Sequence, residues 1–304
     1  MSSNRKPTLL VTGASGHLGR QVLELLLGNY EGKIIAATRT PEKLAEFKQR
    51  GVIVRHADFE DQDSLRLAFE GVDRLLLIST DAVDVPGRRL NQHRNAVKAA
   101  EQSRVKHVVY TSLMNPGPDS PASVAPDHRG TEEALAATRM GWTVLRENIY
   151  TDVLLFSFPQ AVQQGKLFNA IGDGKAAYIT REDCARAAAA ALSSSFEGRQ
   201  ILDITGPHAV SQYELADILS QMTGQEVSYM PLALETHIQN MVAAGLPRQV
   251  AADLASFDAA IAQGKFSAVS STVKDLTGRD PVSLVDFLAT HRDALRQRAA
   301  VSEL

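Results

Sequence analysis

The feature that most constrains the fold is a glycine-rich turn near the start of the chain, between an apolar segment and an amphipathic one. Residues 8–12 are typical of a short buried strand, and residues 17–28 show helical periodicity. Gly13, Gly16 and Gly19 lie between or within them in Gly-x-x-Gly-x-x-Gly spacing. The first glycine permits a tight turn, the second lets phosphates approach the backbone, and the third lets helix and strand pack closely. Free amide groups at the helix start would hold an anion, so the turn predicts a dinucleotide pyrophosphate site.

The residue that follows the second predicted strand indicates which dinucleotide is bound. An acidic residue there accepts hydrogen bonds from the ribose hydroxyls, whereas arginine accommodates a 2′-phosphate. Arg39 stands twenty residues after Gly19, with Lys43 nearby, and this favours NADP, although Arg39 can also be a solvated loop charge. Asp58 and Phe59 follow the third strand, where they can meet the adenine, or Asp58 can cap a turn.

Apolar runs and helical patterns alternate through the first half of the chain. Strands are predicted at 8–12, 33–38, 52–55, 73–79, 107–112 and 142–145, and helices at 17–28, 41–49, 61–69, 91–103 and 126–138. The strand-like runs are unbroken in apolar character, which indicates a parallel sheet covered on both faces. We therefore predict an α/β fold with a Rossmann-type, doubly wound parallel sheet.

The second half of the chain predicts a smaller, mostly helical substrate portion over the carboxyl edge of the sheet. Its patterns favour helices at 153–164, 181–193, 211–222, 233–243, 247–262 and 283–297, and short strands near 167–170, 200–204 and 227–230. We divide the chain into an NADP-binding Rossmann domain, 1–152, and a substrate-binding portion, 153–304, which can share one core with the first.

Composition excludes several classes of protein. The 304 residues carry a net charge of −3, so no basic surface for nucleic acid or anionic membrane is expected. The single cysteine, Cys184, leaves no internal disulfide, and the first seven residues do not resemble a secretory signal. No metal-ligand spacing is present. These features predict a cytoplasmic globular protein. We expect it to be a monomer or homodimer whose partner is a small-molecule acceptor.

The tyrosines constrain the mechanism through the residues four positions after them. The glycine spacing is the one that short-chain dehydrogenases use, and the usual enzyme of that kind donates a proton from a tyrosine activated by a lysine four residues later. None of the six tyrosines has such a lysine; the residues at that position are Ile34, Met114, Leu154, Glu182, Asp217 and Ala233. The standard dyad is therefore absent.

Several further segments together resemble the NmrA-like atypical short-chain dehydrogenases, over nearly the whole chain. They are residues 91–95, 110–113, 127–128 with 131–132, 145–146, 150–152 and 172–175. The similarity is greatest to the branch of bacterial NADPH:quinone oxidoreductases and triphenylmethane reductases. It implies that NADPH passes hydride directly to an electrophilic acceptor, without a Tyr–Lys dyad. The predicted cofactor-binding residues are Gly13, Ser15, Gly16, His17, Leu18, Gly19, Arg39, Lys43, Asp58, Phe59, Ser79, Thr80, Asp81, Ala82, Val83, Ser112, Glu147, Asn148, Ile149 and Tyr150.

Three residues are candidates for the reaction site, namely Tyr150, His128 and Tyr178. Tyr150 would contact nicotinamide or substrate; without a lysine at 154 we expect its phenol to keep a pKa of about 10. His128 can carry a proton near neutral pH or serve as a helix-start or solvent-facing residue. The Ser112 hydroxyl can orient a substrate oxygen or, as a buried group at a strand end, form a hydrogen bond with the backbone.

The chain departs from its relatives at three positions. Glu147 stands where those reductases carry asparagine, Glu133 where the quinone enzymes carry lysine, and Tyr178 where a small polar residue is usual. A carboxylate at 147 could favour the positively charged oxidised nicotinamide or carry a proton. We expect a reductase of a quinone-like acceptor; the alternatives are a redox-sensing regulator that binds NADP without turnover and, less favoured, an isomerase or a reductase of a specialised metabolite.

Overall fold

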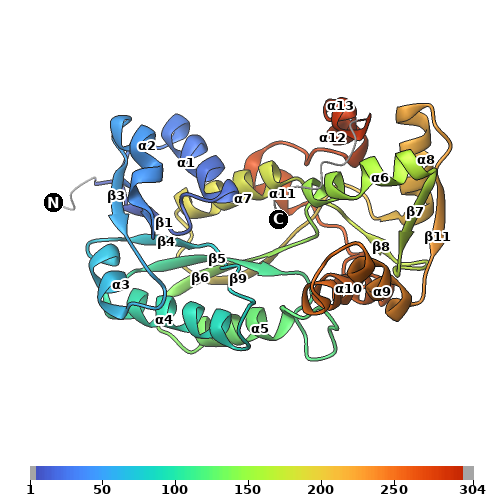
Figure 1. Ribbon diagram of the computed structural model, residues 1–304. Coiled ribbons are helices and arrows are strands. Elements are labelled where there is room, and N and C mark those ends of the chain that lie inside the picture. The colour runs from blue at the N-terminus through green and yellow to red at the C-terminus, as the bar shows by residue number, and fades with distance from the viewer. Residues whose placement is uncertain (1–4, 297–304) are drawn as a thin grey trace.

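The computed structural model describes residues 5–296 and contains a seven-stranded, fully parallel sheet in the order β3-β2-β1-β4-β5-β6-β9 (Figure 1). All seven were predicted as strands from the sequence, six of them as members of this sheet and the one near 200–204 as part of the second portion. The strands are β1 (Leu9–Val11), β2 (Ile34–Thr38), β3 (Ile53–His56), β4 (Arg74–Leu77), β5 (His107–Leu113), β6 (Gly141–Glu147) and β9 (Arg199–Ile204). The predicted doubly wound Rossmann sheet is therefore confirmed.

Helices cover both faces of this sheet (Figure 1). One face carries α1 (His17–Asn29), α7 (Arg181–Ser193) and α11 (Thr272–Thr277), and the other carries α3 (Gln62–Phe69), α4 (Arg88–Gln102) and α5 (Ala125–Ala136). In β1, Leu9 and Val11 enter the core under α1 while Leu10 enters the opposite core, and all three are fully buried. Burial on both faces explains why the strand sequences do not alternate.

Strand order reverses between β1 and β4, because the chain first runs outward to β2 and β3 and then returns to the other side of β1. Such a switch point opens a crevice at the carboxyl ends of the two strands, which is where open α/β sheets bind their ligands. The glycine turn follows β1 and residues 78–83 follow β4, so the topology brings both to this crevice.

The rest of the chain forms a second portion beside the carboxyl ends of β5 and β6 (Figure 1). It holds two small sheets, β7–β11 and β8–β10, and its own apolar core. Its elements are α6 (Phe158–Gln164), β7 (Lys166–Asn169), β8 (Lys175–Ala176), β10 (Val210–Ser211), α8 (Gln212–Thr223), β11 (Ser228–Pro231), α9 (Leu234–Ala243), α10 (Arg248–Ala262), α12 (Leu284–Thr290) and α13 (Arg292–Arg296). Within residues 5–296 no helix is long and apolar enough to cross a membrane.

Three predicted helices are interrupted. Residues 41–49 begin as a 3-10 turn, η1 (Pro41–Leu44), before α2 (Ala45–Gln49). Residues 153–164 divide into η2 (Thr151–Phe156) and α6, which has Pro159 in its first turn. The helix predicted at 283–297 breaks at His291, whose ring nitrogen bonds the Phe287 carbonyl at 2.8 Å, and its last residue lies outside the described chain. Proline and side-chain capping, which override apolar periodicity, explain the last two breaks.

The second half of the chain also contributes to the Rossmann sheet, which the predicted division did not anticipate. Strand β9 extends the sheet beside β6, and α7 packs against α1 on its face. The boundary at 152/153 therefore remains a proposal, and the two portions share part of one core.

Candidate active site

The glycine turn has a backbone geometry that depends on its three glycines to different degrees. Gly13 has φ of +56°, a backbone conformation that favours glycine. A Cβ on Gly19 would lie 2.4 Å from the Gly13 carbonyl oxygen, so only glycine lets α1 approach the turn this closely. Gly16 is the N-cap of α1 and provides no side-chain cap, and a Cβ there would meet one atom, the Gly13 carbonyl oxygen at 3.3 Å. Uncapped amides beside open space fit a bound phosphate.

The end of β2 lies against this turn. Ser15 Oγ and Thr38 Oγ1 are 2.8 Å apart, which fixes the turn to the strand that precedes Arg39. Arg39 is exposed, and within residues 5–296 its guanidinium makes no hydrogen bond or ion pair, only a through-space attraction to Glu60. A cation placed beside the turn and not committed to a partner fits the predicted 2′-phosphate contact.

The residues expected at the adenine have local roles in the chain. Asp58 Oδ1 accepts from the Glu60 amide at 3.0 Å, so this side chain does cap a turn, one of the two alternatives. The Phe59 ring is 8% exposed and belongs to the core under α3 and α4. Contact of either residue with adenine stays a prediction.

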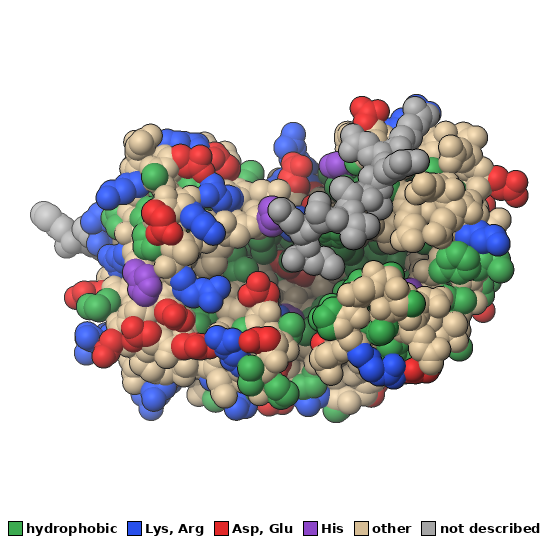
Figure 2. All heavy atoms as spheres, in the orientation of Figure 1, with side chains coloured by type: hydrophobic (Ala, Val, Ile, Leu, Met, Phe, Trp, Pro, Cys, Tyr) green, Lys and Arg blue, Asp and Glu red, His purple; other side chains and the backbone are tan. Residues whose placement is uncertain are grey.

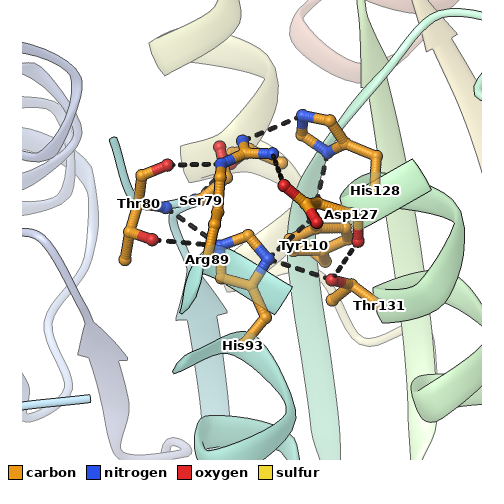
Figure 3. A network of polar contacts seen from close by, with 9 residues as sticks. Ser79, Thr80, Arg89, His93, Tyr110, Asp127, His128 and Thr131 are labelled. Carbon is orange, nitrogen blue, oxygen red and sulfur yellow. Dashed lines mark hydrogen bonds and ion pairs between the residues drawn. The ribbon is translucent and has the colours of Figure 1, made fainter. Parts of the chain in front are cut away.

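A buried polar network fixes the loop after β4 (Figure 3). The Thr80 amide donates to His93 Nε2 at 3.0 Å, and the Thr80 carbonyl accepts from Arg89 Nε at 2.6 Å. The Ser79 amide donates to Thr111 Oγ1 at 2.9 Å. Residues 79 and 80 are thus held by buried side chains, while Asp81 and Val83 remain exposed at the predicted cofactor edge.

The same network sets the protonation of two histidines. Arg89 Nη2 lies 3.0 Å from His128 Nε2, and His128 Nδ1 lies 2.9 Å from the Tyr110 hydroxyl. Because a guanidinium only donates, His128 Nε2 accepts and the ring is neutral with its proton on Nδ1. His93 accepts from Thr80 in the same way. Burial and the Arg89 charge hold the pKa of His128 well below its ordinary value and lower that of His93 to about 3.

The placement of His128 corrects the sequence-based expectation for it. The residue neither starts its helix nor faces solvent: it is the fourth residue of α5 and is 5% exposed. Its buried surroundings could not be recognised from the polar sequence around it. A neutral imidazole that accepts from Arg89 is suited to positioning.

A second cluster lies at the end of β6. The Tyr150 hydroxyl donates to Glu147 Oε2, and the Arg181 guanidinium lies 5.4 Å from the centroid of the Tyr150 ring. Arg181 Nη1 pairs with Asp152 Oδ1 at 3.1 Å. Glu147 is 4% exposed, and its Oε1 has no hydrogen-bond partner among the described residues.

Burial shifts both members of the Glu147–Tyr150 pair. It raises the pKa of Glu147 to about 7, against the opposing effects of the Tyr150 hydrogen bond and the Arg181 charge. The pKa of Tyr150 rises well above its ordinary value through burial and the neighbouring carboxylate. The expectation of an ordinary value of about 10 is therefore wrong, and the correction makes this phenol a still poorer acid.

Two other candidates are committed to protein partners. Ser112 donates to Glu132 Oε1 at 2.6 Å, and Glu132 Oε2 accepts from Arg146 Nη2 at 2.6 Å, so the hydroxyl satisfies a carboxylate instead of backbone. The Tyr178 hydroxyl accepts from Gln212 Nε2 at 3.0 Å, and the residue is 3% exposed in the second core. Their roles toward a ligand remain predictions.

Sequence reasoning missed Arg89, Arg146 and Arg181, which hold the groups around the site. Only Arg181 had a local signal, since it follows the helix-capping Thr180.

Glu132 and Arg146 line a cavity of about 350 Å³, together with Asn115, Pro116, Gly117, Asp119, Arg129 and Lys265. Figure 2 shows the molecule hollowed between the Rossmann portion and the second portion, with acidic and hydrophobic side chains on its walls.

Known proteins are similar to this chain in both sequence and fold. Residues 13–195 match the model of a family described as NAD(P)H-binding. Quinone oxidoreductase 2 of Escherichia coli K12 is 35% identical over 92% of this chain and 97% of its own, and the NmrA-like oxidoreductase flvB of Aspergillus flavus is 31% identical over 95% and 94%.

Solved structures agree with these relatives. An NADPH complex of quinone oxidoreductase QOR2 from E. coli superposes with a TM-score of 0.88 at 34% identity, covering 93% of this chain and 99% of that one. The Citrobacter triphenylmethane reductase complexed with NADP(H) gives 0.87 at 32%, covering 94% and 100%. The chain therefore belongs to the NAD(P)H-binding family, among the NmrA-like oxidoreductases that its motifs indicated.

Proposed function

We propose that the chain is an NADPH-dependent reductase that transfers hydride to a planar, electron-poor acceptor, most suitably a quinone. The observation that carries this proposal is the glycine turn, which has Arg39 beside it without an ion-pair partner among the described residues. At the same edge of the sheet Tyr150 donates its hydroxyl to Glu147, and no lysine lies in the position that would activate it as an acid. The names of the relatives, quinone oxidoreductase and triphenylmethane reductase, support the same reaction class.

The chain's contribution is orientation more than acid catalysis. Bound NADPH supplies the hydride, and the acceptor needs one proton besides to reach the hydroquinone. The turn at residues 13–19 would hold the pyrophosphate, Arg39 the 2′-phosphate, and residues 81–83 and 147–150 the nicotinamide end. His128 and Tyr178 are buried and bonded to protein, which favours water as the source of the proton.

The function is tested by following NADPH oxidation against a panel of quinones, cationic dyes and enones. We expect turnover with quinones at the highest kcat/KM. Tight NADPH binding with no oxidation by any acceptor would instead favour the redox-sensing regulator. We further propose that the protein works in the cytoplasm as a monomer or homodimer, which light scattering of the purified chain and cell fractionation would test.

Replacing Arg39 with alanine should remove the preference for NADPH over NADH. A charge-assisted hydrogen bond to phosphate contributes about 1.5–3 kcal/mol, so the wild-type protein should bind NADPH at least about tenfold more tightly. The measurement is the Kd of both cofactors for both proteins. Equal affinities in the wild type would show that Arg39 does not read the phosphate.

Replacing Tyr150 with phenylalanine should keep kcat within about tenfold, since general acid catalysis, where it operates, is worth about 10²–10⁴. Its phenol is already a poor acid beside Glu147. Alanine should be more harmful because it also removes the ring under Arg181. Steady-state kinetics of both variants with one quinone is the measurement. A thousandfold loss in the phenylalanine variant with normal NADPH binding would make Tyr150 a catalytic acid.

A further inference from the structure

Glu147 is a buried carboxyl group at the edge of the sheet where the nicotinamide is proposed to lie. It is the last residue of β6 and is 4% exposed. Its Oε2 accepts a hydrogen bond from the Tyr150 hydroxyl, while its Oε1 has no hydrogen-bond partner among the described residues. A carboxylate with a single hydrogen bond is poorly compensated for the loss of water.

No cation among the described residues neutralises this carboxyl directly. Arg181, at the start of α7, is the cation that acts on Glu147, but it pairs with Asp152 and stacks on Tyr150. Two acidic groups of α7 lie nearby: Cys184 is buried close to Glu147, and Asp183 is neutralised by its own partner, Arg186. One further positive charge near Glu147 would therefore be attracted by this carboxylate.

We propose that Glu147 makes this site respond to the redox state of its cofactor: the carboxyl gives up its proton beside the oxidised, cationic nicotinamide and keeps the protonation it has in the free protein beside the reduced, neutral one. The inference rests on the proposed function for the position of the nicotinamide. It goes beyond that function, because it predicts that NADP⁺ binding releases a proton and that NADPH binding does not.

The position of Glu147 supports the coupling. Parallel strands place their ligand along the carboxyl edge, and β6 is separated from β1 by β4 and β5, which is about 14 Å at the usual spacing. The pyrophosphate at β1 and the nicotinamide toward β6 can therefore be held by one extended molecule. Charges interact several-fold more strongly at a buried edge than in water.

The sign of the pH dependence follows from linkage. Burial leaves the Glu147 pKa at about 7 in the protein alone, and a cationic ring lowers it. If the ring lowers it by about one unit, the Kd for NADP⁺ falls about fivefold from pH 6 to pH 8. The neutral ring of NADPH leaves the Glu147 pKa unchanged, so the Kd for NADPH gains no pH dependence from this group. Both forms carry the same 2′-phosphate, so titration of that group cancels in the ratio of their Kd values.

The experiment measures the Kd of NADP⁺ and of NADPH by fluorescence titration between about pH 6 and pH 8. In the wild type, the ratio of Kd(NADP⁺) to Kd(NADPH) should fall about fivefold as the pH rises. Glu147→Gln keeps an acceptor for Tyr150 but cannot ionise, and its ratio should be independent of pH. Glu182→Gln, which removes a carboxyl from the first turn of α7, should behave like the wild type.

A second measurement needs no variant. At pH 7, calorimetry in buffers of different ionisation enthalpy should show release of about 0.4 of a proton on NADP⁺ binding and none on NADPH binding. A constant ratio in the wild type, or a pH-dependent ratio that persists in Glu147→Gln, overturns this inference while leaving the reductase proposal intact. Failure of both cofactors to bind overturns the two together, and lack of turnover with any acceptor affects only the reductase proposal.

Discussion

Replacing Gly16 with valine is expected to weaken NADPH binding about a hundredfold or more while the protein stays folded. Two charge-assisted hydrogen bonds lost from a pyrophosphate, at about 1.5–3 kcal/mol each, correspond to at least that factor. Gly16 has φ of −79° and ψ of 171°, which any residue adopts, so the backbone does not require glycine here. A Cβ there would lie 3.3 Å from the Gly13 carbonyl oxygen and meet no other atom of the described residues within 4 Å, so the valine side chain would occupy space beside the turn where the pyrophosphate is proposed to lie.

Two other glycines separate this effect from general damage to the turn. A Cβ on Gly28, near the end of α1, meets no atom within 4 Å, so Gly28→Ala should leave binding unchanged. A Cβ on Gly19 would lie 2.7 Å from Ala14 Cα, so Gly19→Ala should lower stability as well as binding. Fluorescence titration and thermal unfolding of the three variants measure this. Unchanged NADPH affinity in a folded Gly16→Val protein would place the phosphates elsewhere.

The parts of the site that sequence predicted are those whose cause is local. Gly13, Gly16 and Gly19 act within one turn, and their spacing alone implies the backbone geometry that the structure shows. The six strands of the first half were predicted for the same reason, since each contains a local apolar run, and in all of them except the edge strand β3 that run is largely buried. Strand β9 was assigned to the second portion because nothing in its own sequence says which sheet it joins.

The environment of the ionisable groups could not be predicted in this way. His128 and Glu147 owe their shifted pKa values to side chains distant in sequence or to burial that only the packed fold creates. Pairs of contacts such as Glu132 with Arg146 require the register of α5 against β6. The role of each charged residue is thus decided by tertiary packing. Arg88 and Arg89, which are neighbours at the start of α4, illustrate this most directly.

Replacing Arg89 with alanine is expected to destabilise the protein by about 2–4 kcal/mol and to weaken NADPH binding at least about tenfold. Arg89 is 5% exposed, and its removal leaves the part-buried Thr80 carbonyl and the buried His128 Nε2 without their donors. Each such orphan costs about 1–3 kcal/mol. Binding should suffer because Thr80 begins the loop whose residues 81–83 are proposed to meet the cofactor.

Arg88 provides the matched control, since sequence alone does not distinguish the two residues. Its side chain is 37% exposed and pairs with Glu60 and Asp84 at the surface, and such ion pairs contribute about 0–1 kcal/mol. Arg88→Ala should therefore change neither property appreciably. Urea unfolding and NADPH titration of both variants decide the matter. If Arg89→Ala lost stability but bound NADPH normally, the network would support the fold without positioning the loop, because the loop would then keep its binding geometry without the Thr80–Arg89 hydrogen bond.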